Sequence, residues 1–168
     1  MELPYLKVKK LDEKAIIPSK RDEDAGYDLY AHTKEEIIVL EHGEIKLFST
    51  KISIEIPKNW VFYIAERGST GTKGISQRCG VVDSGFRGEI FIPLNNTSNK
   101  IIIFYKDENK LNEFLDENNF NKEEVTIYPL NKAIAQGMLL YCPHVEIEEV
   151  DELGRSLRGS NSLGSSNK

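Results

Sequence analysis

The chain has 168 residues, of which 39% are hydrophobic and 29% charged, a balance typical of one globular domain with a buried core. Its formal net charge of -5 argues against general electrostatic binding of duplex nucleic acid, although a small anionic ligand needs only a local basic pocket. The sequence shows neither an apolar run of the ~18 residues needed for a membrane span nor a signal-peptide core at the N-terminus. We therefore expect a cytoplasmic protein that binds no nucleic acid and no membrane.

The first part of the chain predicts short β-strands followed by a glycine-rich loop. Residues 5–11, 36–50 and 52–57 are β-branched or alternate in polarity, with turns between them. Residues 60–66, WVFYIAE, form a continuous apolar run that predicts a strand buried on both faces. Residues 67–74, RGSTGTKG, predict a loop or a helix cap with free backbone N–H groups suited to phosphate.

Residues 79–96, CGVVDSGFRGEIFIPLNN, predict a β-hairpin with a carboxylate, Asp83, at its turn. Residues 100–106 read as another strand, and 107–119 as a short amphipathic helix with Asp107 near its start. Cys79 and Cys142 have no metal-ligand spacing and are expected to be free thiols.

Strands are also predicted in the last part of the chain, at residues 124–130 and 133–150, before a mobile Gly/Ser-rich tail, 154–168. Many short strands with one or two helices predict an all-β barrel or sandwich.

Five segments stand out by their chemistry, although each one alone has an ordinary structural explanation. Asp28 could be a hydrogen-bonded structural carboxylate, Gln136 could satisfy a backbone group, and the tail could be a disordered end. In their order and spacing, however, the segments resemble the five motifs of the trimeric dUTPase family: AGYDLYA (25–31), RGST (67–70), GVVDSGFRGE (80–89), AIAQ (133–136) and RGSNSLGSS (158–166).

This resemblance implies a jelly-roll-like β-barrel that hydrolyses dUTP to dUMP and pyrophosphate as a homotrimer, with active sites shared between chains. Residues 1–153 would form a single β domain. Residues 98–129 would be an insertion with a short helix between the third and fourth motifs, where a short turn would be enough to continue the barrel. Residues 154–168 would be a flexible tail that closes over an active site.

The resemblance also implies roles for individual residues. Asp83 would orient and deprotonate the water that attacks the α-phosphorus, and Mg²⁺ would be held partly by Asp28 through water. Backbone groups from Gly80 to Val82 would pair with uracil, while Phe86, where the family has Tyr, would leave no room for a 2′-hydroxyl. The other substrate-binding residues would be Arg67, Gly68, Ser69, Gln136, Arg158, Leu163, Gly164, Ser165 and Ser166.

Some positions depart from the family pattern. Gly68 stands where a serine is common, and Leu163 stands where an aromatic ring usually covers uracil. Asn161 and Ser162 replace two glycines of the tail, and Ala133 replaces the usual arginine of the fourth motif. These changes bear on the closure of the tail more than on the reaction.

Two other functions remain open at this point. The first is dCTP deaminase, which resembles the same fold and would use Glu89 to relay protons; the Gly/Ser-rich fifth motif and the absence of an arginine at 70–72 favour dUTPase. The second is a regulatory protein of phage or prophage type that binds a repressor through 98–129. The acidic residues of that segment would attract a basic partner.

Overall fold

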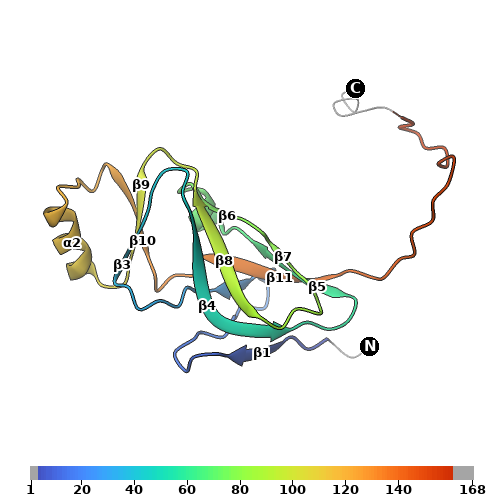
Figure 1. Ribbon diagram of the computed structural model, residues 1–168, viewed down its shortest axis with the longest axis horizontal. Helices are drawn as coiled ribbons and strands as arrows, with labels where there is room; N and C mark the ends of the chain where they lie inside the picture. The colour runs from blue at the N-terminus through green and yellow to red at the C-terminus, as the bar shows by residue number, and fades with distance from the viewer. Residues whose placement is uncertain (1–3, 161–168) are drawn as a thin grey trace.

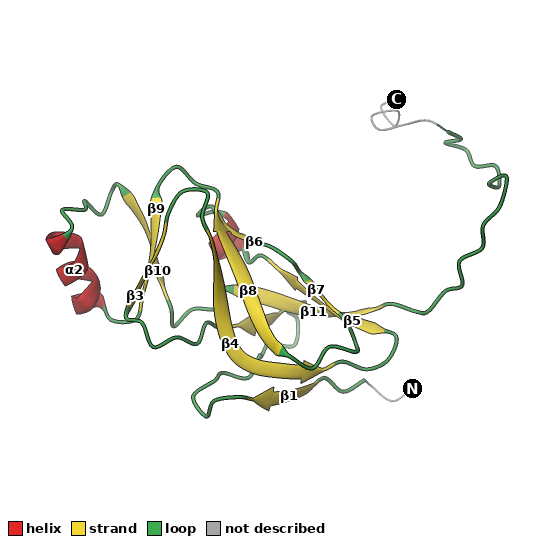
Figure 2. Ribbon diagram, viewed as in Figure 1, coloured by secondary structure: helices red, strands yellow, loops and turns green. Residues whose placement is uncertain are grey.

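The computed structural model describes residues 4–160, and most of their regular secondary structure is β-strand (Figures 1 and 2). Two helices accompany the strands, α1 (Gly68–Gly71) and α2 (Glu108–Glu117). The strands are β1 (Lys7–Lys10), β2 (Tyr27–Leu29), β3 (Ile37–Leu40), β4 (Ile45–Glu55), β5 (Trp60–Ala65), β6 (Ile75–Gln77), β7 (Val81–Val82), β8 (Glu89–Asn96), β9 (Ile101–Tyr105), β10 (Val125–Pro129) and β11 (Ala135–Tyr141). The all-β class expected from the sequence is confirmed.

Three sheets share the strands, in the orders β1-β4-β8-β6, β2-β11-β5-β7 and β10-β9-β3. In several strands alternate side chains enter the main core, as the two-residue period of a strand predicts. In β8, for example, Ile90, Ile92 and Leu94 are buried whereas Phe91 is 46% exposed. The side chains on the opposite face of such a strand are exposed and can contact a ligand or another chain.

Three sequence expectations about strands are wrong. Tyr63 in the middle of β5 is 40% exposed, so β5 is buried on one face only. The segment 79–96 is not a hairpin, because β7 pairs with β5 while β8 pairs with β4 and β6. The last strand ends at Tyr141, and residues 142–160 form an exposed arm that leaves the body of the molecule (Figure 1). An apolar pattern cannot form a strand without a neighbouring strand to pair with.

The helix expected at 107–119 is confirmed as α2, at the opposite end of the molecule from the arm (Figure 1). The Asp107 side chain caps it by accepting hydrogen bonds from the N–H groups of Asn109 and Lys110. Leu111 and Leu115 of the helix pack with Ile103, Val125 and partly buried neighbours in a small hydrophobic cluster separate from the main core.

Strands β9 and β10, on either side of α2, pair in parallel. A parallel pair needs a crossover connection, so the expectation that a short turn would be enough between the third and fourth motifs is wrong. The two strands also reach the main core, since the Phe104 ring lies 4.9 Å from the ring centroid of Phe48 and 5.8 Å from that of Tyr128. Strands β9 and β10 therefore belong to the main fold, and α2 packs on their outer side.

Candidate active site

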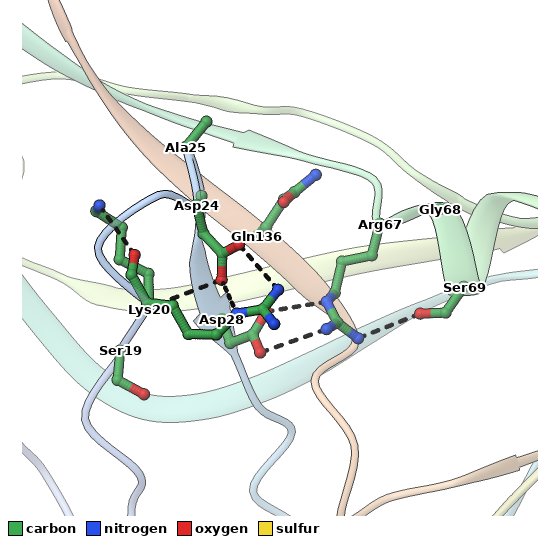
Figure 3. A pocket seen from close by; sticks show the side chains of 11 residues that line it. Ser19, Lys20, Asp24, Ala25, Asp28, Arg67, Gly68, Ser69 and Gln136 are labelled. Atoms are coloured by element: carbon green, nitrogen blue, oxygen red, sulfur yellow. Dashed lines mark hydrogen bonds and ion pairs between the residues drawn. The ribbon is translucent and has the colours of Figure 1, made fainter.

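An ion pair between Asp28 and Arg67 joins the first and second sequence motifs (Figure 3). Asp28 lies on the edge strand β2, and Arg67 caps the N-terminus of α1 just beyond β5. The guanidinium binds the carboxylate through two contacts, Nε to Oδ1 at 2.9 Å and Nη2 to Oδ2 at 3.3 Å. Both side chains are about one-third exposed, so the pair is held in place and still meets solvent.

The carbonyl oxygen of Ala133 fixes the other side of the guanidinium. It accepts a hydrogen bond of 3.2 Å from Nη1 of Arg67 and one of 2.7 Å from the buried hydroxyl of Tyr128. The same Nη1 also donates to the Ser69 hydroxyl at 3.2 Å. Arg67 is thus oriented by residues of the first, second and fourth motifs and by Tyr128 of β10, which the sequence did not single out.

Gln136 lies between Asp28 and Ala65 in the register of β11. Its amide nitrogen donates to the carbonyl of Glu66 at 2.7 Å, so the side chain holds the loop that carries Arg67. Gly26 makes room for it, because a Cβ atom there would lie 2.5 Å from the Gln136 amide oxygen. The glycine of AGYD is therefore required by packing against Gln136.

These residues line a polar cavity of about 650 Å³ (Figure 3). The sequence-predicted residues that the structure brings together here are Asp28, Arg67, Gly68, Ser69 and Gln136. The wall also contains three charged residues that sequence reasoning missed, Lys20, Arg21 and Asp24. Their only signal was a charged run directly before the first motif.

Arg21 and Asp24 form a two-point ion pair at the rim of this cavity. The guanidinium donates to the carboxylate from Nε at 2.8 Å and from Nη2 at 3.0 Å. The hydrogen bond from Arg21 lowers the pKa of Asp24, and that to Asp24 raises the pKa of Arg21. Both groups are therefore charged at neutral pH and largely cancel one another.

A second, smaller cavity of about 260 Å³ contains the other predicted group, Val82, Asp83 and Phe86. Asp83 and Phe86 close a tight turn, with the Phe86 N–H donating to the Asp83 carbonyl at 3.0 Å. The Phe86 ring, 44% exposed, lies over Gly88, where a Cβ atom would come within 2.6 Å of the ring. The turn thus presents a carboxylate and an aromatic face together.

Strand β7 leads into this turn and lies at the edge of its sheet. Gly80, just before it, allows close approach to β5, because a Cβ atom there would lie 2.3 Å from the Ile64 carbonyl. The Gly80 carbonyl accepts the Ile64 N–H at 2.7 Å. Within residues 4–160, β5 is the only strand that pairs with β7, so its outer edge can offer backbone groups to a ligand.

The two cavities lie at opposite edges of one sheet. Asp28 is on β2 and Asp83 follows β7, and β11 and β5 lie between them. Three strand spacings separate these edges, about 14 Å along the sheet. Asp83 does not line the cavity of Arg67, so a single chain does not bring the carboxylate and the guanidinium of the predicted site together.

The remaining predicted residues lie near the C-terminus of the sequence. Arg158 is exposed on the arm of residues 142–160. Leu163, Gly164, Ser165 and Ser166 lie outside the described residues.

Glu89 has a structural role. Its carboxylate, 14% exposed, accepts hydrogen bonds from the Ser49 hydroxyl and, at 3.0 Å, from the Lys51 ammonium. Burial alone would raise the pKa of Glu89, but the hydrogen bonds from Ser49 and Lys51 outweigh it and lower the pKa. These contacts hold an irregularity of β4 in which Lys51 has a left-handed backbone, φ 51°. Because its carboxylate is engaged by Ser49 and Lys51, Glu89 is disfavoured as a proton relay.

Both cysteines are exposed free thiols, as expected from their spacing. No helix within residues 4–160 has the length and apolar character that crossing a membrane demands.

Comparison with known proteins gives consistent matches. The family model described as dUTPase matches residues 12–110. A protein of Nautilia profundicola named deoxyuridine 5'-triphosphate nucleotidohydrolase is 33% identical over 167 residues, which cover 97% of this chain and 99% of the relative.

Solved structures of phage proteins have the same fold. The dUTPase of Staphylococcus bacteriophage 80alpha with dUPNHPP superposes with a TM-score of 0.73 at 24% identity, covering 98% of this chain and 99% of the other. A mutant dUTPase from phage phi11 of S. aureus, described as revealing the coordination of a structural Mg(II) ion, has a TM-score of 0.65 at 21% identity, covering 88% of this chain and 97% of the other.

Proposed function

Since the chain belongs to the dUTPase family, we propose that it hydrolyses dUTP to dUMP and pyrophosphate. One observation supports this most directly: Asp28, Arg67, Ser69 and Gln136, from three separate motifs, converge on one polar cavity. A guanidinium, a hydroxyl and the N–H groups at the start of α1 are the donors that phosphate oxygens prefer.

The phosphate chain would bind in the cavity of Arg67. Because the Asp28 carboxylate and the Ala133 carbonyl already orient the guanidinium, little rotamer freedom is lost when phosphate binds. Gln136 keeps the loop in place through the Glu66 carbonyl. The missing hydroxyl at Gly68 leaves Ser69 as the hydroxyl donor of this loop.

Uracil would bind along the outer edge of β7. An open strand edge offers alternating N–H and C=O groups, which can pair with the polar edge of a pyrimidine. Phe86 would lie against the deoxyribose and exclude a 2′-hydroxyl by contact. Asp83, three residues before it in the same turn, would then orient a water for attack on the α-phosphorus and accept its proton.

The residues present fit a magnesium ion bound together with the substrate. Mg²⁺ is usually held by one or two carboxylates, several waters and substrate phosphates. Within residues 4–160 no cluster of three or more metal-ligating side chains exists, and the carboxylates of the phosphate cavity are Asp24 and Asp28, of which Asp28 is the one that contacts Arg67. Asp28 would hold the ion through water. When bound, magnesium neutralises the charge that develops on the pyrophosphate leaving group.

The separation of the two cavities favours a homotrimer in which each site combines Asp83 of one chain with Arg67 of another. The arm of residues 142–160 supports the same arrangement, because Ile147 and Leu153 on it are 97% and 89% exposed and lack a core of their own. A neighbouring chain would bury them.

A pyrophosphate-release assay with dUTP, dCTP, dTTP and UTP in the presence of Mg²⁺ tests the proposal. Release from dUTP alone would support it. Ammonia release from dCTP would instead identify a deaminase, and turnover of none of the four would leave a binding function.

A further inference from the structure

We propose that Lys20 contacts the phosphate chain of the nucleotide and that it is a determinant of triphosphate affinity outside the five motifs. The inference rests on the proposed function and extends it to one residue that the motifs do not include. Its support comes from the position, charge and contacts of the Lys20 side chain.

The backbone places Lys20 beside the phosphate donors. Ser19 forms an isolated β-bridge with Asp28, in which the Asp28 N–H donates to the Ser19 carbonyl at 2.8 Å. Lys20 is the next residue, and it lines the same cavity as Arg67 and Gln136. Its ammonium points away from Arg67 in this structure, with Asp24 between them (Figure 3), so a change of Lys20 rotamer would bring it to a bound phosphate. The backbone position of Lys20 is fixed through the strand that carries Asp28.

Charge balance singles out Lys20 within this cavity. The cations of the wall are Lys20, Arg21 and Arg67, and the anions are Asp24 and Asp28. Arg21 pairs with Asp24, and Arg67 pairs with Asp28. Among residues 4–160, Lys20 forms no ion pair with a carboxylate, although its charge contributes to the lowered pKa of Asp24. The wall therefore has one positive charge in excess, and Lys20 carries it.

The present contacts of the ammonium are weak enough to exchange for phosphate. It donates to the carbonyls of Arg21 and Asp22 at 3.4 and 3.5 Å, the long limit for a hydrogen bond. It also lies 5.5 Å from the centroid of the Tyr27 ring, a cation–π distance. A phosphate oxygen would replace two long neutral contacts by a charge-assisted one, and no ion pair would have to break.

A triphosphate carries more charge than the two paired arginines can compensate. Each Arg–Asp pair contributes almost no net field, so Lys20 would supply the attraction that depends on the number of phosphates. The contact with Lys20 should therefore raise the affinity for a triphosphate and hardly change the affinity for a monophosphate, whose base and sugar bind at the cavity of Asp83 and Phe86.

Calorimetric binding of dUMP and of a non-hydrolysable imido analogue of dUTP, with Mg²⁺, tests this on the full-length protein. In Lys20→Gln we expect the Kd of the analogue to rise about five- to twentyfold while the Kd of dUMP stays within twofold. Lys20→Arg, which keeps the charge, should stay within threefold of wild type for both. Lys34→Gln, an exposed lysine that lines neither cavity, is the matched control for loss of charge.

The outcomes separate this inference from the proposed function. If wild type hydrolyses dUTP and Lys20→Gln binds the analogue as wild type does, the role of Lys20 is refuted and the enzyme activity stands. An equal loss for dUMP and the analogue would also refute it, because that pattern indicates a structural defect. If wild type does not turn over dUTP, the proposed function itself fails.

Discussion

Asp83 is the residue on which hydrolysis should depend most. The turn that it forms with Phe86 is closed by its backbone carbonyl, so replacing its carboxylate by an amide should keep the backbone geometry. We expect Asp83→Asn to lose most dUTP hydrolysis, since an amide cannot accept the proton of the attacking water. Nucleotide binding should stay within about tenfold, or 1.4 kcal/mol. Near wild-type turnover would show that another group is the base.

Phe86 should decide between deoxyribose and ribose. Its ring is held over Gly88 and would meet a 2′-hydroxyl directly. Phe86→Ala should narrow the preference for dUTP over UTP, measured as the ratio of kcat/KM values. Phe86→Tyr is the control, because it keeps the ring and should keep the preference. If alanine left the ratio unchanged, the backbone would be the selective element.

Glu89 should make stability depend on pH. Because its pKa is lowered in the folded state from a usual value of 4.5, its stabilisation is complete above that value and is lost as the pH falls through the folded pKa. At pH 7, Glu89→Gln should lower the free energy of unfolding by about 1–3 kcal/mol. Denaturant titrations should show this gap shrinking below about pH 4.5; a gap that is constant with pH would exclude the charged contact with Lys51 as its source.

At the scale of elements, α2 and its loops should be dispensable for catalysis. Replacing residues 107–124 by a Gly/Ser linker leaves every motif residue and Tyr128 in place. Because β9 and β10 are parallel, the linker needs at least about 10–12 residues, since a two-residue turn cannot join parallel strands. We expect dUTP hydrolysis and trimer formation to be retained, with a lower Tm because Ile103 and Val125 lose their cover.

Pyrophosphate release, light scattering and a melting curve on the same preparation would measure these effects. Loss of both folding and activity would mean that α2 is part of the enzyme's core. Retention of both folding and activity would show that α2 is not needed for catalysis. Its acidic outer surface in the wild-type protein could then serve the proposed basic partner, such as a repressor.

How far the sequence predicts the elements depends on how local their causes are. Helix α2 was predicted because its cap and its apolar spacing, Asp107, Leu111 and Leu115, lie within a few residues of one another. The partners of β7 and β8 were not, since strand pairing depends on contacts far along the chain. The exposure of Tyr63 was not predicted either, since what covers a face of a sheet also depends on residues far along the chain.

The candidate site divides in the same way. Motif order identified Asp28, Arg67 and Gln136, which meet in one cavity. It could not reveal Tyr128, whose hydroxyl reaches the Ala133 carbonyl only through the pairing of β10 with β9. Nor could it reveal Lys20, because a charged run before a motif usually means a solvated loop.

At the scale of the whole molecule, we expect an assembly of three chains of 19.1 kDa, about 57 kDa in total. Light scattering at micromolar concentration should give this mass, and a monomer would contradict it. Inactive Asp83→Asn chains mixed with inactive chains truncated before Arg158 should recover part of the activity, because some mixed sites receive an intact Asp83 and an intact arm. No recovery after subunit exchange would mean that Asp83 and the arm of each site come from the same chain.

The carbonyl of Ala133 accepts hydrogen bonds from two donors of different origin, the Tyr128 hydroxyl of β10 and the Arg67 guanidinium of the phosphate cavity. This shared acceptor connects β10 physically to the phosphate cavity. If a partner on α2 shifts β10 and thereby changes nucleotide affinity by some factor, then nucleotide must change the affinity of that partner by the same factor. Nucleotide binding in the phosphate cavity would then change the affinity of α2 for its partner at the far end of the molecule.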